Sequence, residues 1–142
     1  ATVRAALGLG ADTARRRSRI LVVDDDPMFA RALRRELERR GVEVLTAEKG
    51  VDALLLMGSV KPDLVLLDLQ LPDIDGLEVT KRLRARPETA EVALVAMSGR
   101  ADDKMRKKLV AAGALAFLQK PFAPDDVVAL IPAREPAVAT AG

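Results

Sequence analysis

Short apolar runs alternate with longer amphipathic stretches from residue 20 onward, a pattern that predicts repeated strand and helix units. The runs at 20–23 and 63–68 are almost continuously apolar, as in strands that are buried on both faces. Three further apolar runs extend the series. The predicted strands are therefore 20–23, 42–47, 63–68, 92–97 and 115–118.

An amphipathic segment follows each predicted strand, and several of these segments carry helix signals at their ends. Asp26 is the predicted N-cap before Pro27, and Gly41 ends this first helix. The second helix contains three consecutive leucines and is predicted to be largely buried. The later helices are predicted at 51–57, at 76–85, from 102–103 to a stop at Gly113, and at 124–131.

These units form one α/β domain, 19–131, around a five-stranded parallel sheet. Residues 1–18 and 132–142 lack sustained apolar periodicity and are interpreted as tails or linkers. An apolar stripe of Val3, Ala6 and Leu7 leaves open the alternative that the N-terminal segment docks on the domain.

The composition excludes several classes of protein function. The chain has no Cys and no His, which excludes disulfides, structural zinc sites, imidazole metal sites, cysteine nucleophiles and Ser-His-Asp triads. No window approaches twenty uncharged apolar residues and the first residues lack a signal-peptide core, so we expect a cytoplasmic protein without a membrane span. Any chemistry is left to carboxylates, hydroxyls and lysines.

Positive charge is concentrated at the N-terminus. Residues 1–19 hold five arginines and one acid, which leaves 18 basic against 20 acidic residues in the remainder. The pI of about 9.2 reflects the absence of His, Cys and Tyr, groups that titrate between the carboxylates and lysine. Because aromatic residues are only 2% of the chain, we expect no direct nucleic-acid binding by the folded domain.

Charged and hydroxyl residues follow the predicted strands. In a parallel sheet the carboxyl ends of the strands meet at one edge, where ligands of such folds bind. The residues at these ends are Asp24, Asp25, Asp26, Asp68, Ser98 and Lys120. A capping role explains Asp26, whereas Asp68 ends a buried run that has no structural need of a charge.

The acidic residues require a positive partner. Two carboxylates roughly 4–5 Å apart repel by about 3–4 kcal/mol at an effective dielectric constant near 20. Lys120 supplies one positive charge, and an oxygen-rich site without His or Cys suits a hard cation such as Mg²⁺. A carboxylate nucleophile, a metal, a hydroxyl and a lysine are together sufficient for phosphoryl transfer onto an aspartate.

Four sequence blocks resemble the signature blocks of the response-regulator receiver domain. They are ILVVDDDP at 20–27, DLVLLDLQLPDIDG at 63–76, AMSG at 96–99 and FLQKPF at 117–122. They stand in the order typical of the family, between about Arg19 and Ile131. The resemblance implies a flavodoxin-like, doubly wound (βα)5 fold with strand order 2-1-3-4-5, and a role in two-component phosphorelay signalling.

The resemblance also assigns roles at the strand ends. Asp68 matches the phosphoacceptor, which takes a phosphoryl group from the phosphohistidine of a histidine kinase or histidine phosphotransfer protein. Asp24 and Asp25 match the acidic pair at the Mg²⁺ ion, with Asp25 as the more direct ligand. Asp68 would be a further metal ligand, and Gln70 would contribute its backbone carbonyl.

Three more positions match the family's switching machinery. Ser98 and Lys120 match the hydroxyl and the ammonium that bind phosphoryl oxygens, and the Lys120-Pro121 bond resembles the family's cis peptide. Phe117 occupies the switch aromatic position. Phosphorylation would draw Ser98 inward and alter the face formed by the fourth helix, fifth strand and last helix. Because Phe117 lacks a hydroxyl, we expect it to populate an inward position even before phosphorylation.

The same reading leaves the output of the domain open. The short last helix would make a homodimer built on it smaller than is common in the family. Only eleven residues follow Ile131, too few for an output domain, so we expect either a stand-alone receiver or a receiver cut from a longer chain. Such a domain catalyses its own phosphorylation and dephosphorylation only and is not otherwise an enzyme; the cognate kinase and the downstream effector are unknown.

Two alternatives remain at this point. A pseudo-receiver would use the fold only as an interaction or scaffold module, although Asp68, Ser98 and Lys120 are all present. A haloacid-dehalogenase-like phosphatase also uses a strand-end aspartate with Mg²⁺, and Asp73 and Asp75 superficially offer its paired acids. Their position in a loop after the strand disfavours that class.

Overall fold

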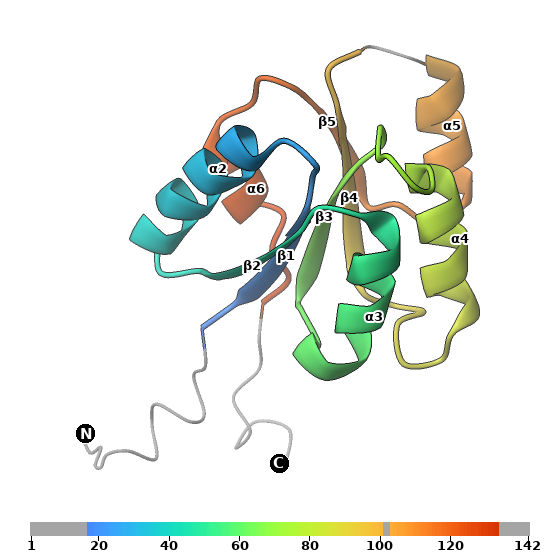
Figure 1. Cartoon of the computed structure of the whole chain (residues 1–142), viewed down its shortest axis with the longest axis horizontal. Coiled ribbons are helices and arrows are strands. Elements are labelled where there is room, and N and C mark those ends of the chain that lie inside the picture. Colours follow the sequence, from blue (N-terminus) through green and yellow to red (C-terminus); the bar gives the residue numbers. More distant parts are fainter. Residues whose placement is uncertain (1–16, 101–102, 134–142) are drawn as a thin grey trace.

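A computed structural model describes residues 17–100 and 103–133, and within them five strands alternate with five helices (Figure 1). The strands are β1 (Arg19–Val23), β2 (Glu43–Ala47), β3 (Leu64–Asp68), β4 (Ala93–Ser98) and β5 (Ala116–Gln119). The helices are α2 (Pro27–Arg39), α3 (Gly50–Val60), α4 (Gly76–Ala85), α5 (Asp103–Ala111) and α6 (Pro124–Val128). Most of the two predicted tails, the apolar stripe at residues 3–7 and the predicted helix start at residue 102 lie outside the described residues.

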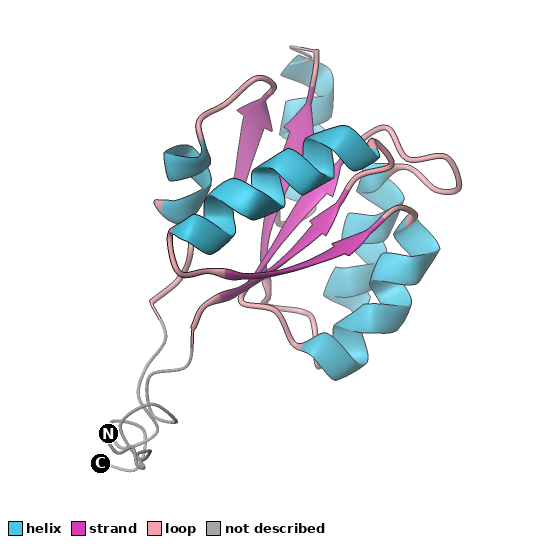
Figure 2. Ribbon diagram, turned by 60° about the vertical axis from the view of Figure 1, so that its left-hand side comes forward, coloured by secondary structure: helices cyan, strands magenta, loops and turns pink. Residues whose placement is uncertain are grey.

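All five strands are parallel and lie in the order β2-β1-β3-β4-β5, which confirms the predicted strand order. Helices α2 and α6 cover one face of the sheet, and α3, α4 and α5 cover the other (Figure 1). Figure 2 shows α2 crossing in front of the strands. The domain is therefore a doubly wound α/β sandwich, in which the carboxyl ends of all strands gather at one edge.

The central strands β1 and β3 are covered on both faces. Ile20 and Val22 belong to the apolar cluster under α2, whereas Leu21 and Val23 belong to the cluster on the side of α3 and α4. Every residue of β3 is buried, including Asp68 at its end. Because alternate side chains of a strand point to opposite faces, a strand between two helix layers needs an unbroken apolar run.

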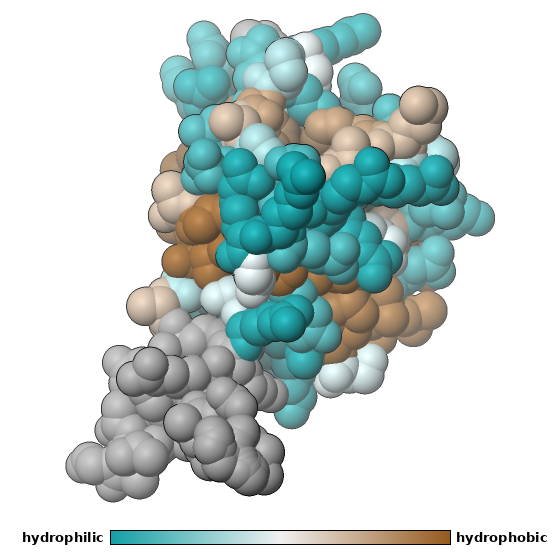
Figure 3. Space-filling view, turned by 90° about the vertical axis from the view of Figure 1, so that its left-hand side faces the viewer, coloured by the Kyte–Doolittle hydropathy of each residue, from teal (hydrophilic) through white to brown (hydrophobic). Residues whose placement is uncertain are grey.

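Helix α2 begins and packs as predicted. The Asp26 carboxylate accepts hydrogen bonds from the backbone N–H groups of Met28 and Phe29, so Asp26 is the N-cap. Leu33 and Leu37 are buried, and most of the charged residues of the helix are exposed. Figure 3 views the molecule from this side, and hydrophilic side chains occupy much of the face. The amphipathic pattern therefore orients α2 on the sheet.

Two helices differ from the prediction. In α3, Leu54 and Met57 are buried but Leu55 is 74% exposed, because three consecutive helical residues cannot all face the sheet. Helix α6 ends at Val128 and not at residue 131, and the chain continues through two turns. No helix in the described ranges is long and apolar enough to cross a bilayer.

Arg84 joins three segments on the side of the sheet covered by α4 and α5. Its guanidinium donates hydrogen bonds to the carbonyls of Ala90 at 2.9 Å, Val92 at 2.8 Å and Gly113 at 2.7 Å. Gly113 has a φ of +106°, and a Cβ at this position would lie 2.7 Å from the Arg84 side chain. Arg84 therefore holds the turn after α4 against the turn after α5.

We predict that Arg84→Lys destabilises the domain by about 2–3 kcal/mol, because one ammonium cannot reach the carbonyls that the guanidinium bridges. Denaturant unfolding followed by circular dichroism measures the change. Arg82→Ala is the matched control on the same helix: its exposed ion pair with Glu78 contributes under about 1 kcal/mol. Equal losses in the two variants would contradict a bridging role for Arg84.

Candidate functional site

Four polar side chains predicted from the sequence lie together at the carboxyl edge of the sheet. Asp24 directly follows β1, Asp68 ends β3, Ser98 ends β4 and Lys120 directly follows β5. These strands are neighbours in the sheet, so residues up to 96 positions apart in the chain meet at this edge. The arrangement is a direct consequence of parallel pairing.

Lys120 lies between the two buried carboxylates. Its Nζ donates a hydrogen bond of 2.7 Å to Asp24 Oδ2 and one of 3.4 Å to Asp68 Oδ2. The other oxygen of each carboxylate accepts a backbone N–H from two residues further along the chain: Asp26 donates to Asp24 at 2.8 Å and Gln70 donates to Asp68 at 3.0 Å. Each carboxylate is thus held at both oxygens.

The electrostatics of the site reflect crowded negative charge. Burial raises the pKa of the Asp68 carboxyl, the N–H of Gln70 opposes that shift, and the charge of Asp24 adds to it. Burial alone would lower the pKa of the Lys120 ammonium, but its hydrogen bond to Asp24 and the two nearby negative charges raise it overall. Lys120 therefore stays charged, and Asp68 carries a negative charge at an energetic cost.

Asp25 completes an acidic cluster. One carboxylate oxygen each from Asp24, Asp25 and Asp68 lie within 4.8 Å of one another. Asp24 is 1% exposed, whereas Asp25 is exposed to solvent. Carboxylates without His or Cys are ligands for a hard divalent cation, so the donor set fits Mg²⁺. The Gln70 side chain is exposed, and its N–H is already bound to Asp68.

The two predicted switch residues, Ser98 and Phe117, have contacts of their own. Ser98 is buried, and its Oγ accepts a hydrogen bond from the N–H of Arg100 at 3.1 Å. Phe117 is only partly buried and belongs to neither apolar cluster of the described residues. The guanidinium of Arg106 lies 5.2 Å from the centre of the Phe117 ring, a contact between α5 and β5 that sequence reasoning did not include.

The two loop acids considered for a phosphatase have other partners. Asp73 accepts hydrogen bonds from the N–H groups of Gly50 and Val51, at the start of α3, and these bonds lower the pKa of its carboxyl. Asp75 accepts from the N–H of Glu78 and is the N-cap of α4. Both acids therefore fix the loop after Asp68 and do not join the acidic cluster.

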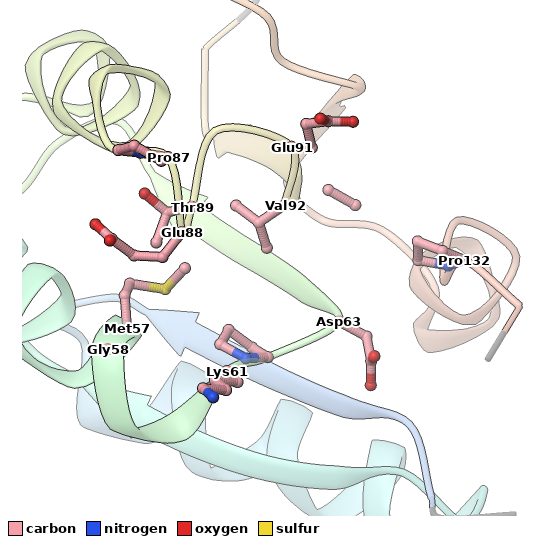
Figure 4. A pocket seen from close by; sticks show the side chains of 12 residues that line it. Met57, Gly58, Lys61, Asp63, Pro87, Glu88, Thr89, Glu91, Val92 and Pro132 are labelled. Carbon is pink, nitrogen blue, oxygen red and sulfur yellow. The ribbon is translucent and has the colours of Figure 1, made fainter. Parts of the chain in front are cut away.

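A cavity of about 580 Å³ lies at the opposite edge of the sheet (Figure 4). Its lining includes Lys61, Asp63 and Val92, which precede the strands β3 and β4. A smaller cavity of about 260 Å³ is lined in part by Asp24. Neither the acidic cluster nor Lys120 lines the larger cavity, so the reactive groups, and not the cavity volume, mark the candidate site.

Sequence reasoning missed one neighbour of Lys120. The Nζ atom lies 4.2 Å from the centre of the Phe29 ring, although 91 positions separate the two residues. In the sequence Phe29 shares the four-residue spacing of Leu33 and Leu37, which indicates only a core position on α2. No local signal distinguishes an aromatic residue that packs in the core from one that faces a cation.

The geometry of the site agrees with the comparison to known families. The family model of the response regulator receiver domain matches residues 20–132. The chain belongs to the response-regulator receiver family. This result confirms the resemblance carried by the four sequence blocks. Phosphorylation is a general property of receiver domains, and they generally bind Mg²⁺ at an acidic pocket such as the aspartate cluster here.

Curated response regulators are similar to this receiver domain over most of its length. Response regulator MprA of Mycobacterium sp. (strain KMS) is 40% identical over 111 residues, which cover 78% of this chain and 47% of MprA. The phosphate regulon transcriptional regulatory protein PhoB of Rhizobium meliloti (strain 1021) is 35% identical over 115 residues, 81% of this chain and 51% of PhoB. The chain thus spans about half the length of these relatives.

Solved structures show the same fold. A response regulator from Chloroflexus aurantiacus J-10-fl superimposes with a TM-score of 0.76 at 33% identity, covering 80% of this chain and 93% of that one. A Burkholderia pseudomallei response regulator with a phosphorylated aspartic acid, a calcium ion and citrate has a TM-score of 0.74 at 30% identity. That match covers 81% of this chain and 66% of the other.

We predict that Asp68→Asn stabilises the domain at pH 7 without Mg²⁺, by about 2–4 °C in Tm. The pKa of Asp68 is raised on folding, so its negative charge costs stability above the folded pKa and costs nothing below the unfolded pKa. The gain should therefore shrink as the pH falls to about 4. Thermal unfolding followed by circular dichroism measures it.

Asp75→Asn is the control for this prediction, because asparagine is as good an N-cap as aspartate and should leave Tm nearly unchanged. An Asp68→Asn variant that is less stable than the parent at pH 7 would contradict the electrostatic account.

Proposed function

We propose that this receiver domain accepts a phosphoryl group on Asp68 from the phosphohistidine of a histidine kinase or histidine phosphotransfer protein, with Mg²⁺ as the cofactor. The observation that carries the proposal is the group of residues around Asp68: a strand-end carboxylate 3.4 Å from the Lys120 ammonium and in one cluster with Asp24 and Asp25. The phosphorylated aspartic acid of the Burkholderia pseudomallei neighbour supports it.

In the proposed reaction an Asp68 carboxylate oxygen attacks the phosphorus atom of the phosphohistidine. A phosphorus–oxygen bond forms as the phosphorus–nitrogen bond breaks, and the electron pair of that bond leaves with the imidazole nitrogen. The product on Asp68 is an acyl phosphate, which water later hydrolyses. The domain would thus catalyse only its own phosphorylation and dephosphorylation.

Asp24, Asp25 and Asp68 are the side chains that would hold Mg²⁺, together with the backbone carbonyl of Gln70. Bound Mg²⁺ supplies positive charge that neutralises the phosphoryl oxygens. Lys120 supplies a second positive charge, and its ammonium already lies 3.4 Å from an Asp68 carboxylate oxygen. Ser98 would donate its hydroxyl proton to a phosphoryl oxygen.

The proposed readout is the face formed by α5, β5 and α6. A phosphoryl group on Asp68 would engage the Ser98 hydroxyl and change the space at the end of β4, next to the strand that carries Phe117. Phe117 would then exchange its partly exposed position under Arg106 for a more buried one. With only five residues in α6, a homodimer through this helix would bury little surface. A downstream effector protein is the alternative partner.

We predict that Asp68→Asn abolishes labelling by a small phosphodonor in the presence of Mg²⁺, because an amide cannot form the acyl phosphate. Intact-protein mass spectrometry detects the added phosphoryl group. Asp26→Asn is the matched control, since Asp26 belongs to the same acidic run but only caps α2, a role that asparagine preserves. Substantial label remaining on the Asp68 variant would refute the assignment.

We predict that Asp25→Asn lowers Mg²⁺ affinity by at least about tenfold, since it removes a ligand charge and leaves the nucleophile in place. At saturating Mg²⁺ the variant should still be phosphorylated. The domain has no Trp or Tyr, so an NMR titration of backbone amides is the suitable measurement. An affinity equal to that of the Asp26→Asn variant would exclude Asp25 as a ligand.

A further inference from the structure

The Lys120 ammonium is surrounded by two carboxylates and an aromatic ring. Asp24 and Asp68 accept its hydrogen bonds at 2.7 and 3.4 Å, and the Phe29 ring centre lies 4.2 Å from the same nitrogen. A cation this close to a ring centre lies within the range of a cation–π interaction. Two of the contacts come from strand ends, and the third comes from the first turn of α2.

The Phe29 ring is held in place by its own neighbours. Its backbone N–H donates to the Asp26 cap at 3.3 Å, so the residue lies in the fixed first turn of α2. Its ring meets the Phe122 ring edge to face, with centres 5.9 Å apart. Phe122 follows Lys120 by two positions, so the lysine and the ring that supports Phe29 belong to the same loop. This arrangement fixes the ring relative to the ammonium.

We propose that Phe29 is a positioning residue for Lys120, whose ring restricts the ammonium to the region between Asp24 and Asp68 and shields it from water. A leucine at this position would also pack against the apolar cluster under α2. Only an aromatic ring adds an electron-rich face toward the cation. The positional effect is a property of the folded domain; its consequence for phosphoryl transfer rests on the proposed function.

The Phe29 ring would affect phosphoryl transfer through the position that the Lys120 ammonium holds before the reaction. Its shorter hydrogen bond is to Asp24, so it must shift toward a phosphoryl oxygen on Asp68 when transfer occurs. An ammonium restricted by the ring lies near both positions, whereas a hydrated and mobile ammonium would have to be ordered during the reaction. Loss of the ring should therefore slow acyl-phosphate formation without removing any reacting group.

The first experiment uses the free domain without Mg²⁺ or phosphodonor. NMR of the lysine side chains should show the Lys120 Hε protons shifted upfield by the Phe29 ring, and Phe29→Leu should move them to ordinary lysine positions. Phe29→Tyr retains a ring face and should keep the upfield shift. Lys120 Hε resonances that do not respond to Phe29→Leu would overturn the proposal.

A double-mutant cycle on stability supplies a second measurement. Phe29→Leu and Lys120→Met should show a coupling of about three- to thirtyfold in the unfolding equilibrium constant, the range of cation–π interactions. Leu33→Ala is the control, because it loses core packing in the same helix and cluster. The effects of Leu33→Ala and Lys120→Met on the unfolding equilibrium constant should multiply to within about twofold, as independent effects do. Equal coupling in the two cycles would show that Phe29 acts through packing alone.

The final measurement is the rate of acyl-phosphate formation from a small phosphodonor at saturating Mg²⁺. Phe29→Leu should slow the reaction several-fold, Phe29→Tyr should restore it, and Leu33→Ala should leave it close to that of the parent. A parent domain that takes no label would refute the proposed function, while the NMR shift and the cycle would still decide the role of Phe29. A Phe29→Leu variant that reacts at the parental rate would overturn the proposed consequence for transfer.

Discussion

Crowding of negative charge at the carboxyl edge of the sheet is the constraint on which the site depends. Asp24 and Asp68 are both buried at this edge, and Lys120 Nζ lies between them. Each carboxylate is further held by a backbone N–H. These contacts stabilise two buried charges that would otherwise repel each other, but one cation does not neutralise them together with Asp25. The remaining negative charge is what makes the site suitable for a divalent cation and a phosphoryl group.

The rest of the fold keeps these groups in place. Apolar residues on both faces of β1 and β3 leave those strands no freedom to shift, so the side chains at their ends have fixed positions. The loop after Asp68 is anchored at two points, because Asp73 binds the start of α3 and Asp75 caps α4. Gly76 lets this loop pack closely, since a Cβ there would lie 2.6 Å from the Leu69 side chain.

The side of the sheet covered by α4 and α5 is organised by different interactions. Arg84 connects the turns that follow α4 and α5, and Arg106 lies over Phe117 on the proposed readout face. Both contacts place a guanidinium against groups from another element. The reactive edge is therefore built from short, buried strand ends, whereas the side covered by α4 and α5 depends on long cationic side chains that span between elements.

Most of the fold and much of the site could be predicted from the sequence. Continuous apolar runs indicate strands buried on both faces, and residues that end such runs must meet at one edge when the strands are parallel. That reasoning needs only short stretches of the sequence, and it correctly predicted that Asp24, Asp68, Ser98 and Lys120 are neighbours. Membership of the receiver family was predicted from motifs that contain the same residues, and the family model confirms it.

Contacts between elements could not be read from the sequence, because they depend on the direction of each side chain and on how helices settle on the sheet. The exposure of Leu55 within an apolar helix, the Arg106 guanidinium over Phe117 and the Phe29 ring beside Lys120 are of this kind. Periodicity determines which face of an element is apolar, and chain order determines which strand ends bear charge. Only the packed structure decides which residue, among several of suitable chemistry, comes within a few ångströms of a reactive group, since that distance is set by the positions of two elements and not by either one.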